Sequence, residues 1–255
     1  MTYILKAGIG CQIDPTINIM HGADITLGDH VYIGPGVKIL PGILTIGDYS
    51  KIHDNTIINP KNYVHLGHLT WIGQGCVIDG TGGLECGNFV GAGINSCLYS
   101  HIRHGDILEG CKYDNNGLLI IEDDVWFVGM CLVSPIYAKK KSMAFLGSVV
   151  TKDMEENHIY GGNPAKDLTD KIGNPWKEIS MDEKMKNIYN YLYEYKKENI
   201  NFDIDSVSFV EQYPSMLNDR TYYNLTDRTY TKHNTQSEIQ FNKWLFKYKA
   251  KFIPK

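Results

Sequence analysis

Histidines are the side chains of this sequence with the clearest capacity for chemistry, and the chain has nine of them. Histidine has an unperturbed pKa of about 6.5, so its imidazole is largely neutral at neutral pH and can accept a proton from a substrate. His101 and His104 lie in the polar segment Tyr99–Leu118, which interrupts a long repeat. A structureless stretch of about twenty residues inside a compact domain is often functional. The alternative is that His101 is only a polar residue at the entry to a loop.

The elements that must position these histidines follow a six-residue repeat. Apolar residues recur at every sixth position, with short slips, and a small or β-branched residue stands four positions after most of them. A period of six fits neither an amphipathic helix, with about 3.6 residues per turn, nor a half-buried strand, with a period of about two. It is the signature of a parallel β-solenoid, in which short strands are joined by tight corners. The ladder begins with Leu27, Ile33 and Ile39, runs to Leu98, and resumes at Ile121.

The two ends of the chain depart from this repeat. Residues 1 to about 24 follow it loosely, with Ile13, Ile19 and Ile25, and we expect them to form an irregular cap, since an uncovered coil would expose unpaired backbone. After Lys166 the six-residue period is lost. The sequence therefore predicts a β-helical domain over residues 1–174 and a small α+β appendage over residues 175–255.

The appendage carries two signals for the start of a helix. The segments Ser180–Glu183 and Thr235–Glu238 both read as capping boxes. Between the two helices, the tetrapeptide Asp-Arg-Thr-Tyr occurs at residues 219–222 and again at 227–230, which either marks two arms of a hairpin or is a coincidence. The expected apolar stripes are Met185, Ile188, Tyr189, Leu192 and, as a possible extension, Tyr195 in the first helix, and Phe241, Trp244, Leu245 and Tyr248 in the second.

Composition argues against several classes of function. The formal net charge of −4 disfavours broad electrostatic attraction to nucleic acid or to an anionic membrane. No apolar run approaches the roughly 18–20 residues of a spanning helix, and the N-terminal residues lack the layout of a secretion signal. The six cysteines include no CxxC pair. Cys76 and Cys131 fall on small inward positions of the repeat, which predicts packed thiols in a reducing cytoplasm.

Three motifs make the repeat more specific. Val125-Trp126 follows Ile121–Asp124, and the segments Gly147–Asp153 and Gly162–Lys166 come next. In this order they resemble the sugar O-acetyltransferase branch of the hexapeptide-repeat acyltransferases, over roughly residues 9–168. The resemblance implies a left-handed parallel β-helix, acetyl-CoA as the acyl donor, and a homotrimer with active sites between neighbouring subunits. Flat-faced prisms can form such a trimer, because cyclic closure leaves no open interface.

The resemblance implies transfer of an acetyl group to a hydroxyl or an amine of a sugar or sugar nucleotide, in surface polysaccharide biosynthesis. Such a transfer needs a base for the acceptor's proton, a donor for the oxyanion, and both substrates held in line. His101 occupies the stretch in which resembling family members carry the catalytic histidine, so we expect it to be the base. The candidates to orient its imidazole are Asp106 and Glu109. For the donor the resemblance implies Trp126, Gly147, Ser148, Lys152 and Lys166; for the acceptor we expect His104, Asp106 and His53.

Two departures from the family pattern bear on this site. Val128 fills a position often occupied by glycine, which would narrow the thioester channel or shift the register by one residue. We expect the oxyanion donor to be a backbone N–H near Phe127–Gly129 or Gly147. The run Lys139–Lys141 replaces the usual Ile-Gly-Asp-Asn corner, and it either adds affinity for phosphate or is a solvated corner.

Three other functions remain open. An N-acyltransferase acting on an amino-sugar nucleotide would use the same fold and donor. A non-catalytic trimeric scaffold would use the aromatic-rich appendage as a partner surface. A zinc enzyme similar to the γ-class carbonic anhydrases would use the pairs His65/His68 and His101/His104. The spacing of these pairs does not match that family, and we predict no metal ligands.

Overall fold

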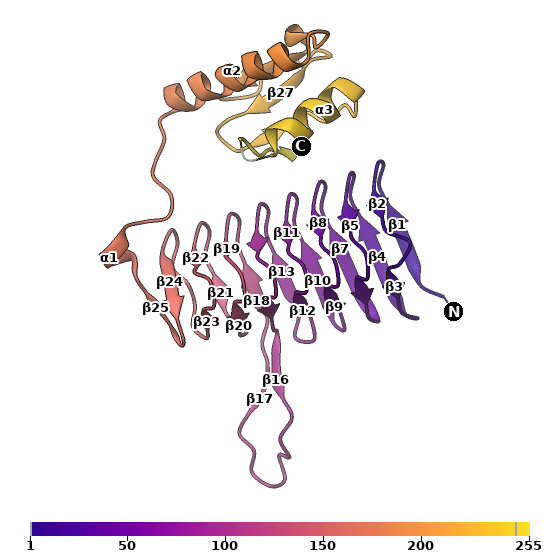
Figure 1. Ribbon diagram of the computed structural model, residues 1–255, viewed down its shortest axis with the longest axis vertical. Coiled ribbons are helices and arrows are strands. Elements are labelled where there is room, and N and C mark those ends of the chain that lie inside the picture. Colours follow the sequence, from indigo (N-terminus) through magenta and orange to yellow (C-terminus); the bar gives the residue numbers. More distant parts are fainter. Residues whose placement is uncertain (1, 248) are drawn as a thin grey trace. The chain divides into compact units, whose positions relative to one another are not determined.

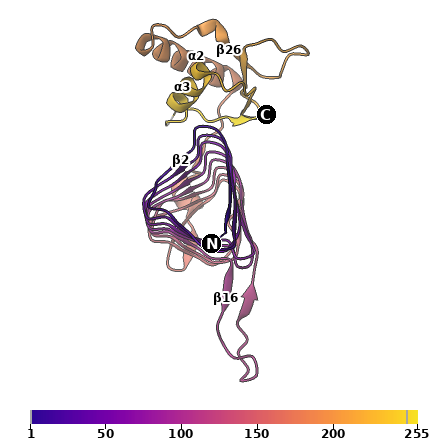
Figure 2. The same cartoon turned by 90° about the vertical axis from the view of Figure 1, so that its right-hand side faces the viewer.

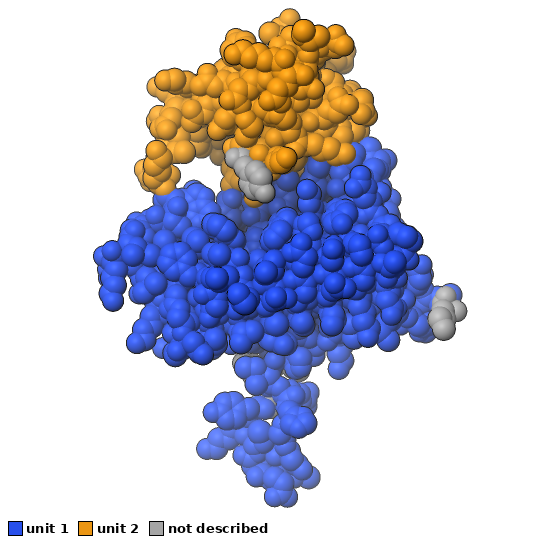
Figure 3. Space-filling model, in the orientation of Figure 1, with its two compact units in different colours: residues 1–176 blue, residues 177–255 orange. Residues whose placement is uncertain are grey.

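The computed structural model of the chain describes residues 2–247 and 249–255. It consists of two compact units, residues 1–176 and residues 177–255 (Figure 3). The sequence placed the boundary between residues 174 and 175. Each unit has its own hydrophobic core.

Unit 1 is a β-helix in which each coil contributes one short strand to each of three sheets (Figure 1). Successive coils pair in parallel, as Ile33 does with Ile52 and Ile52 with Ile72. Viewed from its N-terminal end, the chain turns counter-clockwise as it recedes, so the helix is left-handed (Figure 2). The predicted mainly β fold, a left-handed parallel β-helix, is confirmed.

The chain passes through sheets A, B and C in turn, which creates A–B, B–C and C–A corners. Sheet A contains β1 (Ile4–Ala7), β4 (Ala23–Leu27), β7 (Gly42–Ile46), β10 (Tyr63–Leu66), β13 (Leu84–Cys86), β18 (Leu119–Ile121) and β21 (Tyr137–Ala138). Sheet B contains β2 (Gln12–Ile13), β5 (Tyr32–Ile33), β8 (Lys51–Ile52), β11 (Trp71–Ile72), β14 (Gly91–Ala92), β19 (Trp126–Phe127), β22 (Met143–Ala144), β24 (Ile159–Gly162) and β25 (Ala165–Asp167). Sheet C contains β3 (Asn18–Ile19), β6 (Lys38–Ile39), β9 (Ile57–Asn59), β12 (Val77–Asp79), β15 (Cys97–Leu98), β20 (Leu132–Val133) and β23 (Val149–Val150).

The six-residue ladder places apolar side chains in the interior of the prism. Ile33, Ile52 and Ile72 stack on one another and are buried. A slip of one residue would turn such positions to solvent, so burial sets the register. Cys76 and Cys131 are fully buried free thiols, as predicted.

The first coil is regular, so the expectation of an irregular N-terminal cap is wrong. Strands β1, β2 and β3 pair in parallel with β4, β5 and β6. The reason is visible in the sequence, since Ile13 and Ile19 already keep the six-residue spacing. These strands form the edges of the three sheets in the described part of the chain, and the inward Leu5, Ile13 and Ile19 are only partly buried.

The interruption of the repeat is a hairpin that leaves the solenoid at the C–A corner (Figures 1 and 2). Its arms, β16 (His101–Arg103) and β17 (Asp114–Asn116), are antiparallel, with His101 opposite Asn116. The loop between them carries apolar side chains into solvent, and Leu108 is 96% exposed. The sequence predicted an aperiodic loop here, and the structure adds the pairing of its two ends.

The C-terminal end of the solenoid is a tight hairpin. Strands β24 and β25 are antiparallel, with Gly162 opposite Ala165, so the Gly162–Lys166 motif turns the chain back along the last strand of sheet B. A one-turn helix, α1 (Thr169–Ile172), follows.

Unit 2 packs two helices and a four-stranded sheet around an aromatic core. The elements are α2 (Met181–Glu198), η1 (Ile204–Ser206), β26 (Val207–Val210), β27 (Thr221–Asn224), β28 (Thr229–Tyr230), α3 (Gln236–Leu245) and β29 (Ile253–Pro254). Strands β27 and β28 are antiparallel, with Tyr223 opposite Tyr230, so the Asp-Arg-Thr-Tyr doublet does mark two arms of a hairpin.

Both predicted helix starts are confirmed. The Ser180 and Thr235 side chains each accept a hydrogen bond from the backbone N–H three residues later. Tyr189, expected on the buried stripe of α2, is exposed instead, and Tyr248 lies outside the described residues. Within residues 2–247 and 249–255, no helix has the length and apolar character needed to cross a membrane.

Candidate active site

His101 stands where the chain leaves the solenoid. It follows β15 and opens β16 at the C–A corner. Its Nδ1 lies 2.7 Å from Oδ2 of Asp79, which ends strand β12 in the preceding coil. The side chain of His101 is 32% exposed and that of Asp79 is 4% exposed. A partly exposed imidazole is therefore held by a buried carboxylate.

Asp79 is the centre of a hydrogen-bond network built from successive coils. Its Oδ2 also accepts bonds from the backbone N–H and the hydroxyl of Ser100, at 3.2 and 2.9 Å. Its Oδ1 accepts bonds from the Thr81 hydroxyl at 2.7 Å and the Asn59 amide at 2.9 Å. Burial by itself raises the pKa of Asp79, but the bonds from Thr81, His101 and Ser100 outweigh it and hold the pKa below its ordinary value. Asp79 is therefore ionised at neutral pH.

The ionised Asp79 decides which nitrogen of His101 can act as a base. A carboxylate only accepts hydrogen bonds, so the neighbouring Nδ1 of His101 carries a proton. In the neutral ring, Nε2 then has the free lone pair. This pairing lets Nε2 remove a proton from a hydroxyl or an amine, while the carboxylate stabilises the imidazolium that forms.

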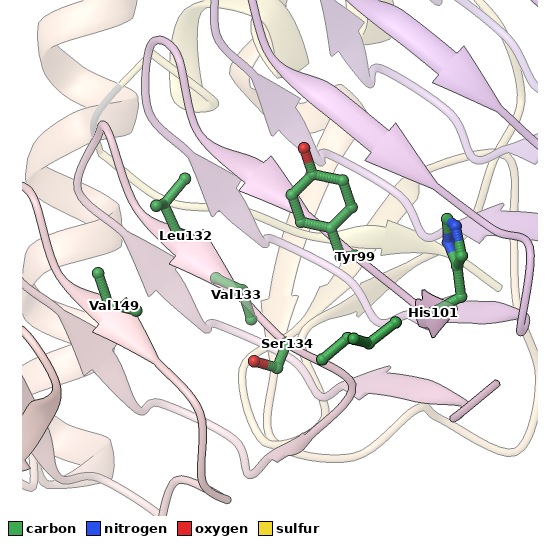
Figure 4. A pocket seen from close by; sticks show the side chains of 7 residues that line it. Tyr99, His101, Leu132, Val133, Ser134 and Val149 are labelled. Carbon is green, nitrogen blue, oxygen red and sulfur yellow. The ribbon is translucent and has the colours of Figure 1, made fainter. Parts of the chain in front are cut away.

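A cavity of about 250 Å³ lies beside His101 (Figure 4). Three of its lining residues, Tyr99, His101 and Ser134, have side chains with a polar group. The remaining wall residues are Ile102, Leu132, Val133 and Val149. A reacting carbon placed next to His101 would therefore lie at the mouth of an apolar cavity.

The cavity belongs to an apolar stripe on the outer face of sheet C. The stripe consists of outward residues that pair across neighbouring strands: Ile57, Val77, Cys97, Leu132 and Val149. Ile57 is 40% and Leu132 46% exposed. A row of exposed aliphatic side chains is typical of a surface that another molecule covers.

His53 and Trp126 lie on a different face of the prism. The His53 ring is 5.0 Å from the ring of Trp71, which points outward from sheet B, and burial lowers the pKa of His53. Trp126 also points outward from sheet B, opposite Gly91. Since His101 is at the C–A corner, a single chain does not bring His53 or Trp126 to it.

Gly147 and Ser148 form part of the B–C corner, at the other end of sheet C from His101. Ser148 is fully buried; its hydroxyl and its N–H both bond to the Phe145 carbonyl, and its own carbonyl accepts from Leu132 N–H. With no exposed atom, Ser148 has nothing to offer a ligand, so the expectation that it contacts the donor is not supported by its placement.

The two lysines expected to contact the acyl donor, Lys152 and Lys166, are separated. Lys152 follows β23 at the C–A corner, and β23 lies two strands from β15 in sheet C. Neighbouring strands are about 4.8 Å apart, so the coil of Lys152 is roughly 10 Å from that of His101 along the helix axis. Lys166 lies in β25, at the edge of sheet B. Of the two, Lys152 shares the corner of His101.

His104 and Asp106 lie in the loop that joins β16 and β17. Oδ1 of Asp106 accepts a bond from Leu108 N–H at 2.8 Å and so shapes the turn. The expectation that Asp106 or Glu109 orients the imidazole is wrong, because Asp79 does so. Acceptor binding by His104 and Asp106 stays a prediction.

The two departures from the family pattern have plain structural outcomes. Strand β19 ends one residue before Val128 and pairs with β14 and β22 in the regular parallel register. Val128 therefore does not shift the register between these coils. Lys139 and Lys140 form ion pairs with Glu155 and Glu156, at 2.6 and 3.2 Å. These ion pairs favour the simpler explanation of the lysine run, a charged corner at the surface.

The histidines that suggested zinc lie apart. His65 packs on Tyr63, with ring centroids 4.9 Å apart, on the outer face of sheet A. Nδ1 of His68 accepts a bond from Asp48 N–H at 2.9 Å. Among the side chains that the structure describes, no group of three His, Cys, Asp or Glu comes together in a way that could hold a metal ion.

Asp79 is the residue of the candidate site that sequence reasoning missed. Strand β12 pairs with β15 so that Ile78 lies opposite Leu98. Asp79 therefore lies one coil before Tyr99 and reaches the corner of His101. The signal in the sequence is an acidic residue directly after the inward Ile78, one coil length before the interruption of the repeat.

No protein-family model matches the chain. It resembles the structure of VCA0836, a hexapeptide-repeat-containing acetyltransferase from Vibrio cholerae O1 biovar eltor complexed with acetyl coenzyme A, at 18% identity and a TM-score of 0.36, over 63% of this chain and 68% of that one. A mutant of AntD, an N-acyltransferase from Bacillus cereus in complex with dTDP and coenzyme A, matches at 15% identity and a TM-score of 0.48, over 76% and 91% of the two chains. The polysialic acid O-acetyltransferase OatWY matches at 17% identity and a TM-score of 0.36, over 74% and 99%. These values are too low to transfer an activity or a residue role to this chain.

Proposed function

We propose that this protein is an acyltransferase that moves an acyl group from a coenzyme A thioester, with acetyl-CoA as the simplest donor, to a hydroxyl or an amine of a sugar or sugar nucleotide. The acceptor's oxygen or nitrogen atom attacks the thioester carbonyl carbon, and Nε2 of His101 takes the proton from that atom. The carbon–sulfur bond breaks, the ester or amide bond forms, and the proton passes from the imidazolium to the departing CoA thiolate.

The Asp79–His101 pair carries this proposal. It supplies a base with a defined tautomer and an oriented ring at the mouth of a cavity, which is what a positioned general base requires. The order of the Val125-Trp126, Gly147–Asp153 and Gly162–Lys166 motifs supports the same reaction class.

We also propose that the protein works as a homotrimer with its sites between subunits. Two observations support this: the exposed Ile57 end of the apolar stripe on sheet C, which lies away from the cavity, and the separation of His101 from Trp126 on different faces of one prism. A neighbouring copy that packs its sheet B against the C–A corner would bring a second Trp126 to His101. The six unpaired cysteines support a reducing compartment, and we propose cytoplasmic surface polysaccharide assembly.

The test is acyl transfer by the His101→Ala variant, followed as release of the CoA thiol across sugars, nucleotide sugars and amines. Loss of a general base should lower kcat by roughly 10²–10⁴, with donor affinity little changed. The His65→Ala variant, on the outer face of sheet A, is the control and should keep full activity. Full turnover in His101→Ala would contradict the assignment, and donor binding without turnover on any acceptor would favour a scaffold.

A further inference from the structure

The cavity beside His101 has the chemistry of a hydrocarbon site. Leu132 and Val149 come from neighbouring strands of sheet C, and Ile102 comes from the hairpin arm β16. Figure 4 shows the side chains of Leu132 and Val149 on the opposite side of Tyr99 from His101. A group bound there would extend from the reacting atoms at His101 along an apolar wall.

The lining decides between the possible occupants. A sugar ring carries hydroxyls on most of its carbons, and the pantetheine arm carries two amides. Both would have polar groups facing hydrocarbon without partners, which is unfavourable. An alkyl chain has no such groups and would cover Leu132 and Val149, which are otherwise partly open to water.

The size of the cavity points beyond an acetyl group. A methyl group needs a volume similar to that of one water molecule, roughly 30 Å³, whereas the cavity measures about 250 Å³. We infer that this cavity holds the alkyl chain of the acyl donor, so that the enzyme prefers an acyl group several carbons longer than acetyl. This inference rests on the proposed acyltransferase function. The longer group is transferred by the same step, with proton transfer through His101 to the CoA thiolate.

The first test compares acetyl-, propionyl-, butyryl- and hexanoyl-CoA as donors for the full-length protein with one acceptor. An added methylene in a hydrophobic pocket changes kcat/KM by about 10–200-fold. The cavity is open on one side, so we expect a smaller gain, of about tenfold in total for the two methylenes that separate acetyl- from butyryl-CoA. A kcat/KM that is highest for acetyl-CoA and falls with each added carbon would overturn the inference.

Filling the cavity should remove the preference. Leu132→Phe and Val149→Phe should each lower the ratio of butyryl to acetyl kcat/KM by about tenfold. Ile43→Phe is the matched control, since Ile43 is an exposed aliphatic residue on the outer face of sheet A, and it should leave the ratio unchanged. Equal ratios in all three variants would overturn the inference.

Binding separates this inference from the proposed function. S-butyl-CoA, an unreactive thioether, should bind about tenfold more tightly than CoA in calorimetry, and Leu132→Phe should abolish the difference. No turnover with any donor would contradict the proposed function alone. Equal affinities of S-butyl-CoA and CoA, with turnover intact, would contradict the alkyl site alone.

Discussion

At the scale of single residues, the site depends on a carboxylate that is buried and still charged. A carboxylate without partners in such a place would become protonated. Asp79 keeps its charge because donors from Asn59, Thr81, Ser100 and His101 converge on its two oxygens. The same contacts fix the ring of His101, so the charge state of one residue and the orientation of the other have one cause.

Replacing Asp79 by asparagine should therefore impair catalysis more than folding. An amide cannot stabilise the imidazolium, and it allows the wrong tautomer of His101. We expect kcat to fall by about 10²–10⁴ with an almost unchanged KM for the donor. The measurement is steady-state kinetics, with Asp24→Asn on the outer face of sheet A as control. An unchanged kcat in Asp79→Asn would remove Asp79 from the mechanism.

The depressed pKa of Asp79 also predicts a pH dependence of stability. The folded-state pKa lies below the ordinary value of 3.8, so the unfolded chain binds the proton more readily. The stabilisation is therefore present above the ordinary pKa and is lost as the pH falls through the lowered one. In urea unfolding at a series of pH values, the free-energy difference between the wild type and Asp79→Asn should be largest near neutral pH and shrink in acid. A difference that grows in acid would contradict this sign.

At the scale of elements, the corners of the solenoid bring backbone into close contact between coils. At the B–C corner, a Cβ on Gly93 would collide with the backbone carbonyl of Val128 in the next coil. A Cβ on Gly91, in the strand just before this corner, would come 3.1 Å from Cδ1 of Trp126, an exposed side chain that can move. Glycine is thus required at 93 by the backbone of residue 128, which cannot yield.

The pair Gly93→Ala and Gly91→Ala tests this contact. Overpacking against backbone should cost about 1–3 kcal/mol at Gly93, and the cost at Gly91 should stay within about 0.5 kcal/mol. Both changes in the free energy of unfolding can be measured by urea unfolding, monitored with an optical probe that lies in unit 1. Equal costs would show that the close approach at Gly93 relaxes without penalty.

At the scale of the whole molecule, the Ile57 end of the apolar stripe on sheet C, away from the cavity, predicts the assembly. Light scattering coupled to size exclusion should give a mass about three times that of the 28.9 kDa chain. Ile57→Lys puts a charge into the stripe and should shift the protein toward the monomer, because a buried unpaired charge is costly. Ile43→Lys, which puts the same charge on sheet A, where Ile43 is 51% exposed, should remain trimeric. A wild-type protein that runs as a monomer would remove this support for sites between subunits.

The sequence by itself determined the architecture and the place of the proposed base. A six-residue period leaves one solution for burying Ile33, Ile52 and Ile72, and His101 stands at the start of the aperiodic segment that interrupts the repeat. The first coil shows that even loose spacing at Ile13 and Ile19 was enough to specify a regular coil. These features are local and periodic, so they can be read without coordinates.

Only the tertiary structure decided which residues meet. Asp79 is 22 residues (101 − 79) before His101 in the chain and 2.7 Å from it in space, because one coil separates them. Trp126 is nearly as close to His101 in sequence and lies on another face, because the chain turns a corner between them. Contacts across coils depend on coil length and corner geometry together, so the partner of His101 and the apolar cavity beside it became visible only in three dimensions.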